Sequence, residues 1–213
     1  MTNHEDGEWH HEVITAPSEA TLRLLRDASL LDRFYLAGGT GLALQFGHRR
    51  SQDLDFFATD LFDEQPLIQR LQTLKDFSLV AEAPHMLHTV IQGSRVTFLG
   101  YAYPVLFPFA QFLDVAVADP RDIACMKVSA IASRGTKRDF VDLYVCAQQF
   151  GLANILQWFD RKYAQTHHNK LHVLKSLTFF GDAEKDPMPH MLVPLDWEQV
   201  KRFFIQGVPL LVC

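Results

Sequence analysis

The spacing of the hydrophobic residues changes once along this chain, near residue 118. Between residues 53 and 117 apolar residues form short or alternating runs, as in residues 54–57 and 95–101, which is the pattern of β-strands. From residue 119 they recur at the helical period, with Asp119 as a helix N-cap and Pro120 at the first helical position. The change predicts an α+β part followed by a helical part.

The same patterns predict the individual elements. We expect strands at residues 34–37, 54–57, 77–81, 89–91, 95–101 and 112–115. We expect helices at residues 18–30, 40–46, 66–74, 120–132, 138–149, 153–163, 170–177 and 197–205. The chain then divides into a polar leader that need not be ordered (residues 1–17), a mixed sheet with flanking helices (18–118) and a helical part (119–213).

Composition excludes several classes of protein. Hydrophobic residues make up 48% of the chain and aromatic residues 12%, which is enough apolar surface for a core. No apolar run approaches the roughly 18 residues that a membrane span requires. The N-terminus, with Glu5, Asp6 and Glu8, lacks the basic and then apolar order of a signal peptide. We therefore expect a cytoplasmic protein with no membrane partner.

Charge and cysteine content narrow the expectations further. The formal net charge of -5 provides no overall basic field, so a nucleic acid would have to be bound by a local patch. Cys125, Cys146 and Cys213 are odd in number and show no CxxC spacing, which predicts buried free thiols instead of a disulfide framework or zinc ribbon. The histidines also follow none of the common zinc spacings.

A double glycine lies between a predicted strand and a predicted helix. Gly38, Gly39 and Thr40 occupy this junction. Glycine lets the backbone approach a ligand closely, and the N-terminus of a helix offers unpaired amides to an anion such as a phosphate. A Gly-Gly pair is also an ordinary way to turn a strand into a helix, and that alternative stays open.

Two aspartates follow at alternate positions of the next predicted strand. Asp53 and Asp55 would lie on one face, about 6.5 Å apart along the strand. Like charges at this spacing repel each other unless a cation lies between them, and Mg²⁺ is the expected partner of such oxygen ligands. The alternative is a solvent-exposed pair with no ligand.

The helical part carries a second set of charged residues. Lys127 lies in an apolar helix stripe, and Arg134 is the next cation on that face two turns later. Lys127 either extends to the surface along its apolar stem or binds a triphosphate. Asp139 and Asp142 are three residues apart at the start of the next helix. We expect Asp142 to interact with the helix dipole and a salt-bridge partner, and Asp139 to act as a base or metal ligand.

Four motifs taken together resemble one known family. They are LAGGTGLAL at residues 36–44, HRRSQDLDFF at 48–57, Lys127 with Arg134, and KRDFVDLY at 137–144. In this order and spacing, over residues 34–145, they are similar to the motifs of the AbiEii/AbiGii (MenT-like) family. Its members are nucleotidyltransferase toxins of type IV toxin-antitoxin and phage-defence systems.

The resemblance implies a fold and a set of site residues. It implies a polymerase-β-like nucleotidyltransferase core within residues 18–118, with residues 119–213 completing the active site. The implied metal is Mg²⁺ or Mn²⁺, and the implied substrate is an NTP. The implied nucleotide-binding residues are Gly38, Gly39, Thr40, Lys127 and Arg134, the implied metal ligands are Asp53 and Asp55, and the implied catalytic residues are Asp53, Asp55, Lys127 and Asp139.

The resemblance also implies a reaction and its partners. The expected reaction moves a nucleoside monophosphate from an NTP to an RNA acceptor such as a tRNA 3′ end, in a toxin that has a cognate antitoxin. Five basic residues beside the motifs are candidates for contact with RNA phosphates, namely His48, Arg49, Arg50, Lys137 and Arg138.

One position departs from the pattern. Many nucleotidyltransferases of this fold carry a third carboxylate on a later strand, where this sequence has Thr97. Either Asp139 completes the metal site, or the metal is held loosely and activity is weak. Two alternatives therefore stay open, namely transfer of the nucleotide to a protein, and a catalytically idle module that binds nucleotides or a partner.

Overall fold

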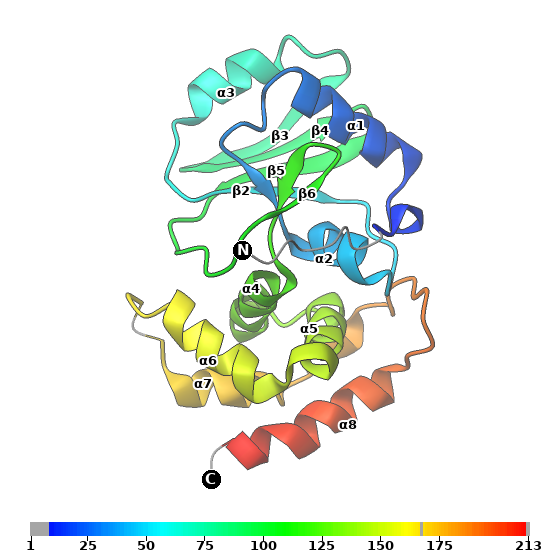
Figure 1. Ribbon diagram of the computed structural model, residues 1–213, viewed down its shortest axis with the longest axis vertical. Helices are drawn as coiled ribbons and strands as arrows, with labels where there is room; N and C mark the ends of the chain where they lie inside the picture. Colours follow the sequence, from blue (N-terminus) through cyan, green and yellow to red (C-terminus); the bar gives the residue numbers. More distant parts are fainter. Residues whose placement is uncertain (1–8, 167, 212–213) are drawn as a thin grey trace. The chain divides into compact units, whose positions relative to one another are not determined.

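The computed structural model describes residues 9–166 and 168–211, and the chain forms two compact units (Figure 1). The first unit takes the chain as far as Ala102 together with Phe109–Ala118. The second takes Tyr103–Pro108 together with the chain from Asp119 onward. None of the helices within the described residues is both long and apolar enough to cross a membrane.

The first unit contains a mixed sheet of seven strands in the described residues. Their order across the sheet is β3-β4-β5-β2-β1-β7-β6. β2 pairs with β5 and β1 with β7 in parallel, and the other neighbours are antiparallel. The strands are β1 (Tyr35–Leu36), β2 (Leu54–Ala58), β3 (Phe77–Ala83), β4 (Met86–Ile91), β5 (Ser94–Gly100), β6 (Ala110–Phe112) and β7 (Val115–Val117). The sheet and its helices confirm the predicted α+β class.

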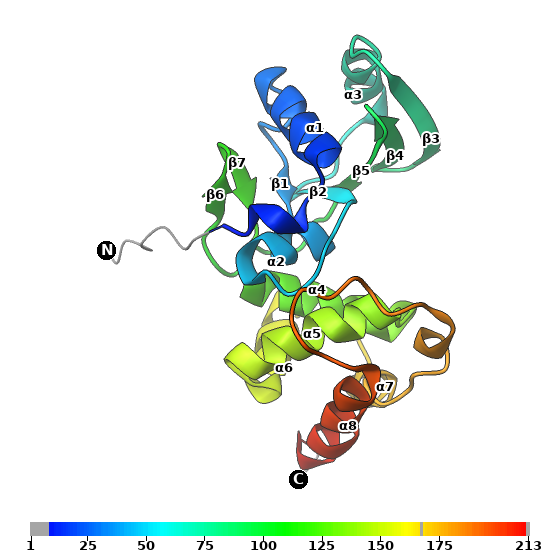
Figure 2. The same cartoon turned by 90° about the vertical axis from the view of Figure 1, so that its right-hand side faces the viewer.

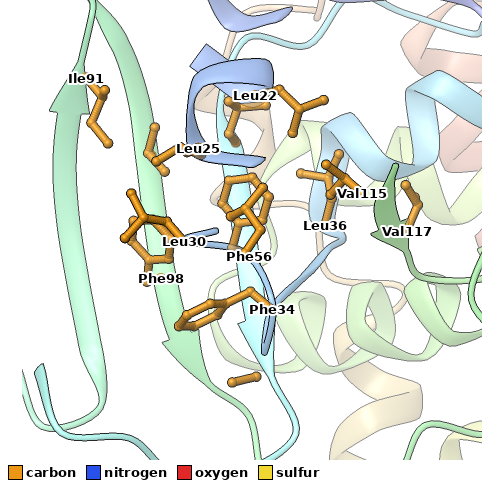
Figure 3. Packing of buried hydrophobic residues seen from close by; sticks show 14 of the residues in the cluster. Leu22, Leu25, Leu30, Phe34, Leu36, Phe56, Ile91, Phe98, Val115 and Val117 are labelled. Carbon is orange, nitrogen blue, oxygen red and sulfur yellow. The ribbon is translucent and has the colours of Figure 1, made fainter. Parts of the chain in front are cut away.

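Helices of the first unit cover the apolar face of this sheet. They are α1 (Ala16–Asp27), α2 (Gly38–Phe46) and α3 (Glu64–Leu71), with a short 3-10 helix η1 (His11–Val13) before them. Figure 3 shows Leu22 and Leu25 of α1 packed with Phe56 and Phe98 of the sheet. Burial alternates along β2, so the residues that flank Phe56 belong to the opposite, half-exposed face.

Local residue choice explains where α1 begins. The helix begins at Ala16, slightly earlier than expected, because the Thr15 hydroxyl accepts a hydrogen bond from the Ser18 amide. A proline near its start needs no amide partner there. Part of the segment expected to be a polar leader is ordered, since η1 spans His11–Val13 and the side chains of Val13 and Ile14 are buried in the core.

One predicted strand is wrong. Residues 112–115 form a hairpin instead, in which Phe112 ends β6 and Val115 begins β7. Leu113 and Asp114 between them have φ values of 52° and 60°. Two consecutive residues with positive φ form the tight turn that joins antiparallel strands. The sequence lacks the usual Asn-Gly or Asp-Gly signal at this point, so its pattern does not predict the turn.

The second unit is helical, as predicted. Its helices are α4 (Pro120–Ser133), α5 (Lys137–Phe150), α6 (Leu152–Lys162), α7 (Lys170–Ser176) and α8 (Trp197–Gly207), with 3-10 turns η2 (Ala183–Lys185) and η3 (Val208–Leu211) (Figure 2). Cys125 on α4 and Cys146 on α5 are buried free thiols, as expected. Cys213 lies outside the described residues.

Segment 103–108 is held in the second unit by a buried ion pair. The Lys162 ammonium donates to the Asp122 carboxylate and to the Pro104 carbonyl, both at 2.8 Å. The Asp122 carboxylate also accepts from the amides of Leu106 and Phe107, at 3.0 and 2.9 Å. Lys162 and Asp122 are each 2% exposed. The chain therefore leaves the first unit at residue 103 and returns to it at residue 109, which the sequence did not predict.

Candidate functional site

The residues of the predicted site fall into two clusters, one in each unit, and each is described by itself. We call the first the acidic strand site. It consists of Gly38, Gly39 and Thr40 at the start of α2, and of Asp53 and Asp55 at the start of β2. We call the second the buried lysine network, which consists of Lys127 and Arg134 at α4, and of Thr136, Asp139 and Asp142 at α5.

Both glycines lie inside the first turn of α2, and charged side chains pack against them. Gly38 has φ +61°, and a Cβ there would lie 2.7 Å from Oδ2 of Asp55. A Cβ at Gly39 would collide with Nη2 of Arg49. The glycines are thus required for a close approach, here of an aspartate and an arginine. The Asp55 carboxylate lies beside the helix N-terminus, where the dipole favours negative charge.

Thr40 holds the backbone of the acidic strand site. Its side chain is fully buried. The hydroxyl donates to the carbonyl of Asp53 and lies 2.8 Å from the Ser51 hydroxyl. The Thr40 side chain therefore positions Asp53, the residue before β2. Because its hydroxyl is used in this way, the backbone amide is the group of Thr40 that is predicted to contact a phosphate.

Asp53 lies directly before β2 and contacts β5. Nε of Arg95 donates to Oδ1 of Asp53 at 2.7 Å. The Arg95 side chain is 70% exposed and the Asp53 side chain 30%. Sequence reasoning missed Arg95, because its contact with Asp53 depends on the parallel pairing of β2 with β5, which periodicity does not reveal.

Thr97, the residue at the position where many enzymes of this fold carry a third carboxylate, lies next to Asp55. The two residues are partners in the register of β2 and β5, and Thr97 is in turn the partner of His88 on β4. Nδ1 of His88 lies 3.2 Å from the Thr97 hydroxyl. A row of Asp55, Thr97 and His88 therefore crosses one face of the sheet, and its middle residue offers a hydroxyl in place of a third carboxylate.

The acidic strand site offers two carboxylates to a cation. Within the described residues no group of three or more His, Cys, Asp or Glu side chains is arranged to hold a metal ion. Mg²⁺ commonly binds through one or two carboxylates and completes its shell with water and substrate phosphates. Asp53 and Asp55, with the close approach that Gly38 allows, fit such a substrate-dependent site and do not form an all-protein cage.

The buried lysine network joins α4 to α5. Nζ of Lys127 lies 3.0 Å from Oδ1 of Asp139 and 2.7 Å from Oδ2 of Asp142. The side chains of Lys127, Asp139 and Asp142 are 9%, 4% and 0% exposed. Lys127 therefore does not extend to the surface, so the alternative that it does so along its apolar stem is wrong. Asp142 forms the salt bridge that the sequence predicted.

The second oxygen of Asp139 is also engaged. The Thr136 hydroxyl donates to Oδ2 of Asp139 at 2.5 Å, and Nε of Arg134 lies 3.8 Å from the same oxygen. Burial raises the pKa of the Asp139 carboxyl, but the Lys127 ammonium and the hydrogen bonds from Thr136 and Lys127 outweigh it, so the pKa lies below its usual value. Asp139 is thus a stable carboxylate. Arg134, 72% exposed, is the accessible cation of this network.

Most of the basic residues predicted to contact RNA phosphates do not lie at the protein surface. His48, Arg49 and Lys137 are 1%, 3% and 7% exposed. The Lys137 ammonium donates to the Asp186 carbonyl at 2.6 Å, so it is used inside the second unit. Arg50 and Arg138 remain exposed. A run of basic residues in a sequence does not show which side chains point inward, and three of these five side chains do.

Comparison with known proteins places the chain among nucleotidyltransferase toxins. The family described as "Nucleotidyl transferase AbiEii toxin, Type IV TA system" matches residues 22–97 and 94–211. An uncharacterised protein of Aquifex aeolicus is 33% identical over 181 residues, which cover 82% of this chain and 86% of that protein.

Solved structures share the fold. MenT4, a nucleotidyltransferase toxin from Mycobacterium tuberculosis, has a TM-score of 0.56 at 16% identity and covers 93% of this chain and 86% of its own. JHP933 from Helicobacter pylori has a TM-score of 0.50 at 17% identity, with 93% of both chains covered. These similarities confirm the nucleotidyltransferase fold with its polymerase-β-like core. With the family match over most of its length, the chain belongs to the AbiEii nucleotidyltransferase toxin family of type IV toxin-antitoxin systems.

Proposed function

We propose that this protein transfers a nucleoside monophosphate from an NTP to an RNA acceptor such as a tRNA 3′ end, with Mg²⁺ or Mn²⁺ as the metal. The family supplies the class of reaction, nucleotidyl transfer. The observation that most supports a role for this chain's own residues is the Asp55 carboxylate packed against Gly38 at the N-terminus of α2. A carboxylate beside backbone amides provides separate places for a cation and for phosphate oxygens.

In this reaction the acceptor hydroxyl oxygen bonds to the α-phosphorus. The bond from that phosphorus to the pyrophosphate oxygen breaks, pyrophosphate leaves, and the hydroxyl proton passes to a base. Asp53 and Asp55 are the proposed ligands of the metal, which when bound neutralises phosphate charge. Backbone amides of Gly38, Gly39 and Thr40 are proposed to orient the phosphates. Thr40 keeps Asp53 in place through its buried hydroxyl.

The buried lysine network is proposed to serve the same reaction through its charges. Arg134 is exposed and available to a triphosphate. Lys127 is a proposed triphosphate ligand, and a phosphate would share its ammonium with Asp139 and Asp142, which it contacts. Asp139 is the proposed catalytic carboxylate. Its low pKa favours electrostatic work over proton transfer, since a weak base takes a proton poorly near neutral pH.

The acceptor and the biological partners form the finer part of the proposal. An RNA acceptor is proposed from the family resemblance of the motifs, and the exposed Arg50 and Arg138 are the candidate contacts for its phosphates. A cognate antitoxin is proposed from membership of a type IV toxin-antitoxin family. A cytoplasmic location stays a prediction from the sequence.

Labelling with each NTP in turn tests the proposal. The purified full chain is incubated with Mg²⁺, an α-phosphate-labelled NTP and total tRNA. We expect label on RNA that ribonuclease removes. Asp55→Asn should reduce the rate by about 100-fold or more, because it removes one charge from the metal site. Asp60→Asn is the matched control, since Asp60 is a 65% exposed aspartate of the same unit that pairs with Arg33, and it should keep full activity.

Two outcomes contradict the proposal in different ways. Label that appears on protein and survives ribonuclease would establish protein nucleotidylation. Absence of NTP consumption with every base, with and without RNA, would establish an idle module, for which Thr97 beside Asp55 would then be the structural reason.

A further inference from the structure

Arg95 occupies one of the two carboxylates that the proposed function assigns to a metal. Its Nε donates to Oδ1 of Asp53 at 2.7 Å. Arg95 lies on β5 two positions before Thr97, so the two side chains project from the same face of the sheet. Thr97 is the partner of Asp55 in the register of β2 and β5. The guanidinium and a divalent cation would therefore compete for the same carboxylate.

Stability alone gives little reason for this contact. An ion pair between exposed side chains contributes about 0–1 kcal/mol at most sites, and the Arg95 side chain is 70% exposed. Within the described part of the chain, the bond from Nε is the hydrogen bond that Arg95 makes. Its terminal Nη groups make no hydrogen bond to the described residues, and they have the planar arrangement that matches two oxygens of a phosphate.

The residue paired with Asp55 in the sheet strengthens the competition between Arg95 and a divalent cation for Asp53. A third carboxylate beside Asp55 would let the site hold a guanidinium and a divalent cation together. Thr97 stands there instead, and its hydroxyl lies 3.2 Å from Nδ1 of His88. With two carboxylates, a divalent cation and Arg95 repel each other at Asp53, and the singly charged guanidinium is the one displaced.

We propose that Arg95 is a substrate-phosphate ligand that rests on Asp53 until a divalent cation takes this carboxylate. The proposal rests on the proposed function, because it needs the metal at Asp53 and a nucleotide beside it. In the free protein Arg95 weakens metal binding. In the loaded protein the released guanidinium binds the triphosphate, so a single residue couples the arrival of the metal to that of the nucleotide.

The coupling gives Arg95→Ala two effects of opposite sign. Affinity for Mn²⁺ alone should rise by about 1.5- to 5-fold, the range expected for loss of an exposed ion pair. Affinity for a non-hydrolysable NTP analogue at saturating Mn²⁺ should fall by about 10-fold or more, since charged hydrogen bonds to phosphate are lost. Arg95→Lys should leave Mn²⁺ affinity near the unaltered value and recover NTP affinity only in part, because lysine keeps the charge without the planar fork.

Arg33→Ala is the matched control. Arg33 is a half-exposed arginine of the same unit whose Nη2 lies 2.6 Å from the exposed Asp60. Both affinities are measured by calorimetry on the full chain, with the melting temperature as a check on folding, and Arg33→Ala should change neither affinity.

The outcomes separate this proposal from the proposed function. Unchanged or weaker Mn²⁺ binding in Arg95→Ala overturns the competition at Asp53, and unchanged NTP affinity overturns the phosphate contact. After either result, the proposed metal site is still supported if Asp53→Asn abolishes Mn²⁺ binding. Failure of both the unaltered chain and Arg95→Ala to bind Mn²⁺ overturns the metal site and this proposal together.

Discussion

A methyl group at Gly38 would occupy the space that the Asp55 carboxylate uses. We expect Gly38→Ala to displace Asp55, to weaken Mn²⁺ binding and to reduce nucleotidyl transfer, because a Cβ there lies 2.7 Å from Oδ2. It should also cost about 1–2 kcal/mol of stability, since its φ is positive.

Gly93→Ala separates these two effects. Gly93 has φ +79°, and among the described residues nothing lies within 4 Å of a Cβ built there. This variant should show the backbone cost without the loss of metal binding. Calorimetric Mn²⁺ titrations and thermal melting of both variants test the expectation. Equal Mn²⁺ affinity in the two would show that the close approach at Gly38 is dispensable.

Lys127 is expected to be as important for folding as for nucleotide binding. Lys127→Met leaves Asp139 and Asp142 buried without their cation, which typically costs about 3–5 kcal/mol. Lys185→Met is the control, because Lys185 and Asp182 form an exposed pair in the same unit whose loss costs about 1 kcal/mol or less. Urea unfolding of both variants measures the difference, and equal midpoints would exclude an energetic role for the network.

The pKa of Asp139 predicts a dependence of stability on pH. Burial raises this pKa, yet Lys127 and Thr136 lower it further, so the folded protein binds the proton more weakly than the unfolded chain. The resulting stabilisation is present above the unfolded value of about 3.9 and is lost as pH falls through the lower folded value. Between about pH 5 and pH 3, unaltered protein should therefore lose more stability than Asp139→Asn. Parallel urea midpoints for the two proteins would contradict this expectation.

At the scale of elements, the sequence predicts which segments are strands or helices better than it predicts which of them pair or pack together. Strand and helix periods are local, so β2, β5, α4 and α5 appear near their expected positions. The parallel pairing of β2 with β5 and the packing of α4 on α5 are not local. For this reason the motif residues could be recognised one by one, whereas the contacts of Arg95 with Asp53 and of Lys127 with two aspartates could not.

The thiols of α4 and α5 report on the packing of these helices. Burial raises the pKa of Cys125 to about 12, helped by Asp122. Burial likewise raises the pKa of Cys146 well above its usual value, with Asp142 adding to the effect. Both thiols should therefore resist a thiol reagent in the folded protein and react only as the helices separate.

The measurement uses a Cys213→Ser background, which removes the thiol that lies outside the described residues. We expect the labelling rate to follow the unfolded fraction along a urea titration. Rapid labelling without urea would contradict the buried packing of α4 and α5.

At the scale of the whole molecule, the second unit contains a segment from earlier in the chain. A fragment of residues 119–213 lacks Pro104, Leu106 and Phe107, so Asp122 loses two amide donors and Lys162 loses a carbonyl acceptor. Each buried polar group left unpaired costs about 1–3 kcal/mol. We expect this fragment to unfold at lower urea than one in which residues 103–108 are joined to residue 119 by a Gly-Ser linker in place of 109–118. Equal midpoints would show that the segment contributes nothing to the unit.

The position of segment 103–108 also bears on how such proteins diversify. Recombination at residue 118 would seem the natural way to exchange the helical unit between relatives, yet it would leave the donor's Asp122 and Lys162 facing a foreign segment. Phe107 would lose its partners as well, since the Arg121 guanidinium lies over its ring at 3.9 Å and Trp158 meets it edge to face at 5.3 Å. Substitutions in this segment and in its helical neighbours should thus be inherited together, and an exchange that carries residue 103 with the helices should yield more functional chimeras.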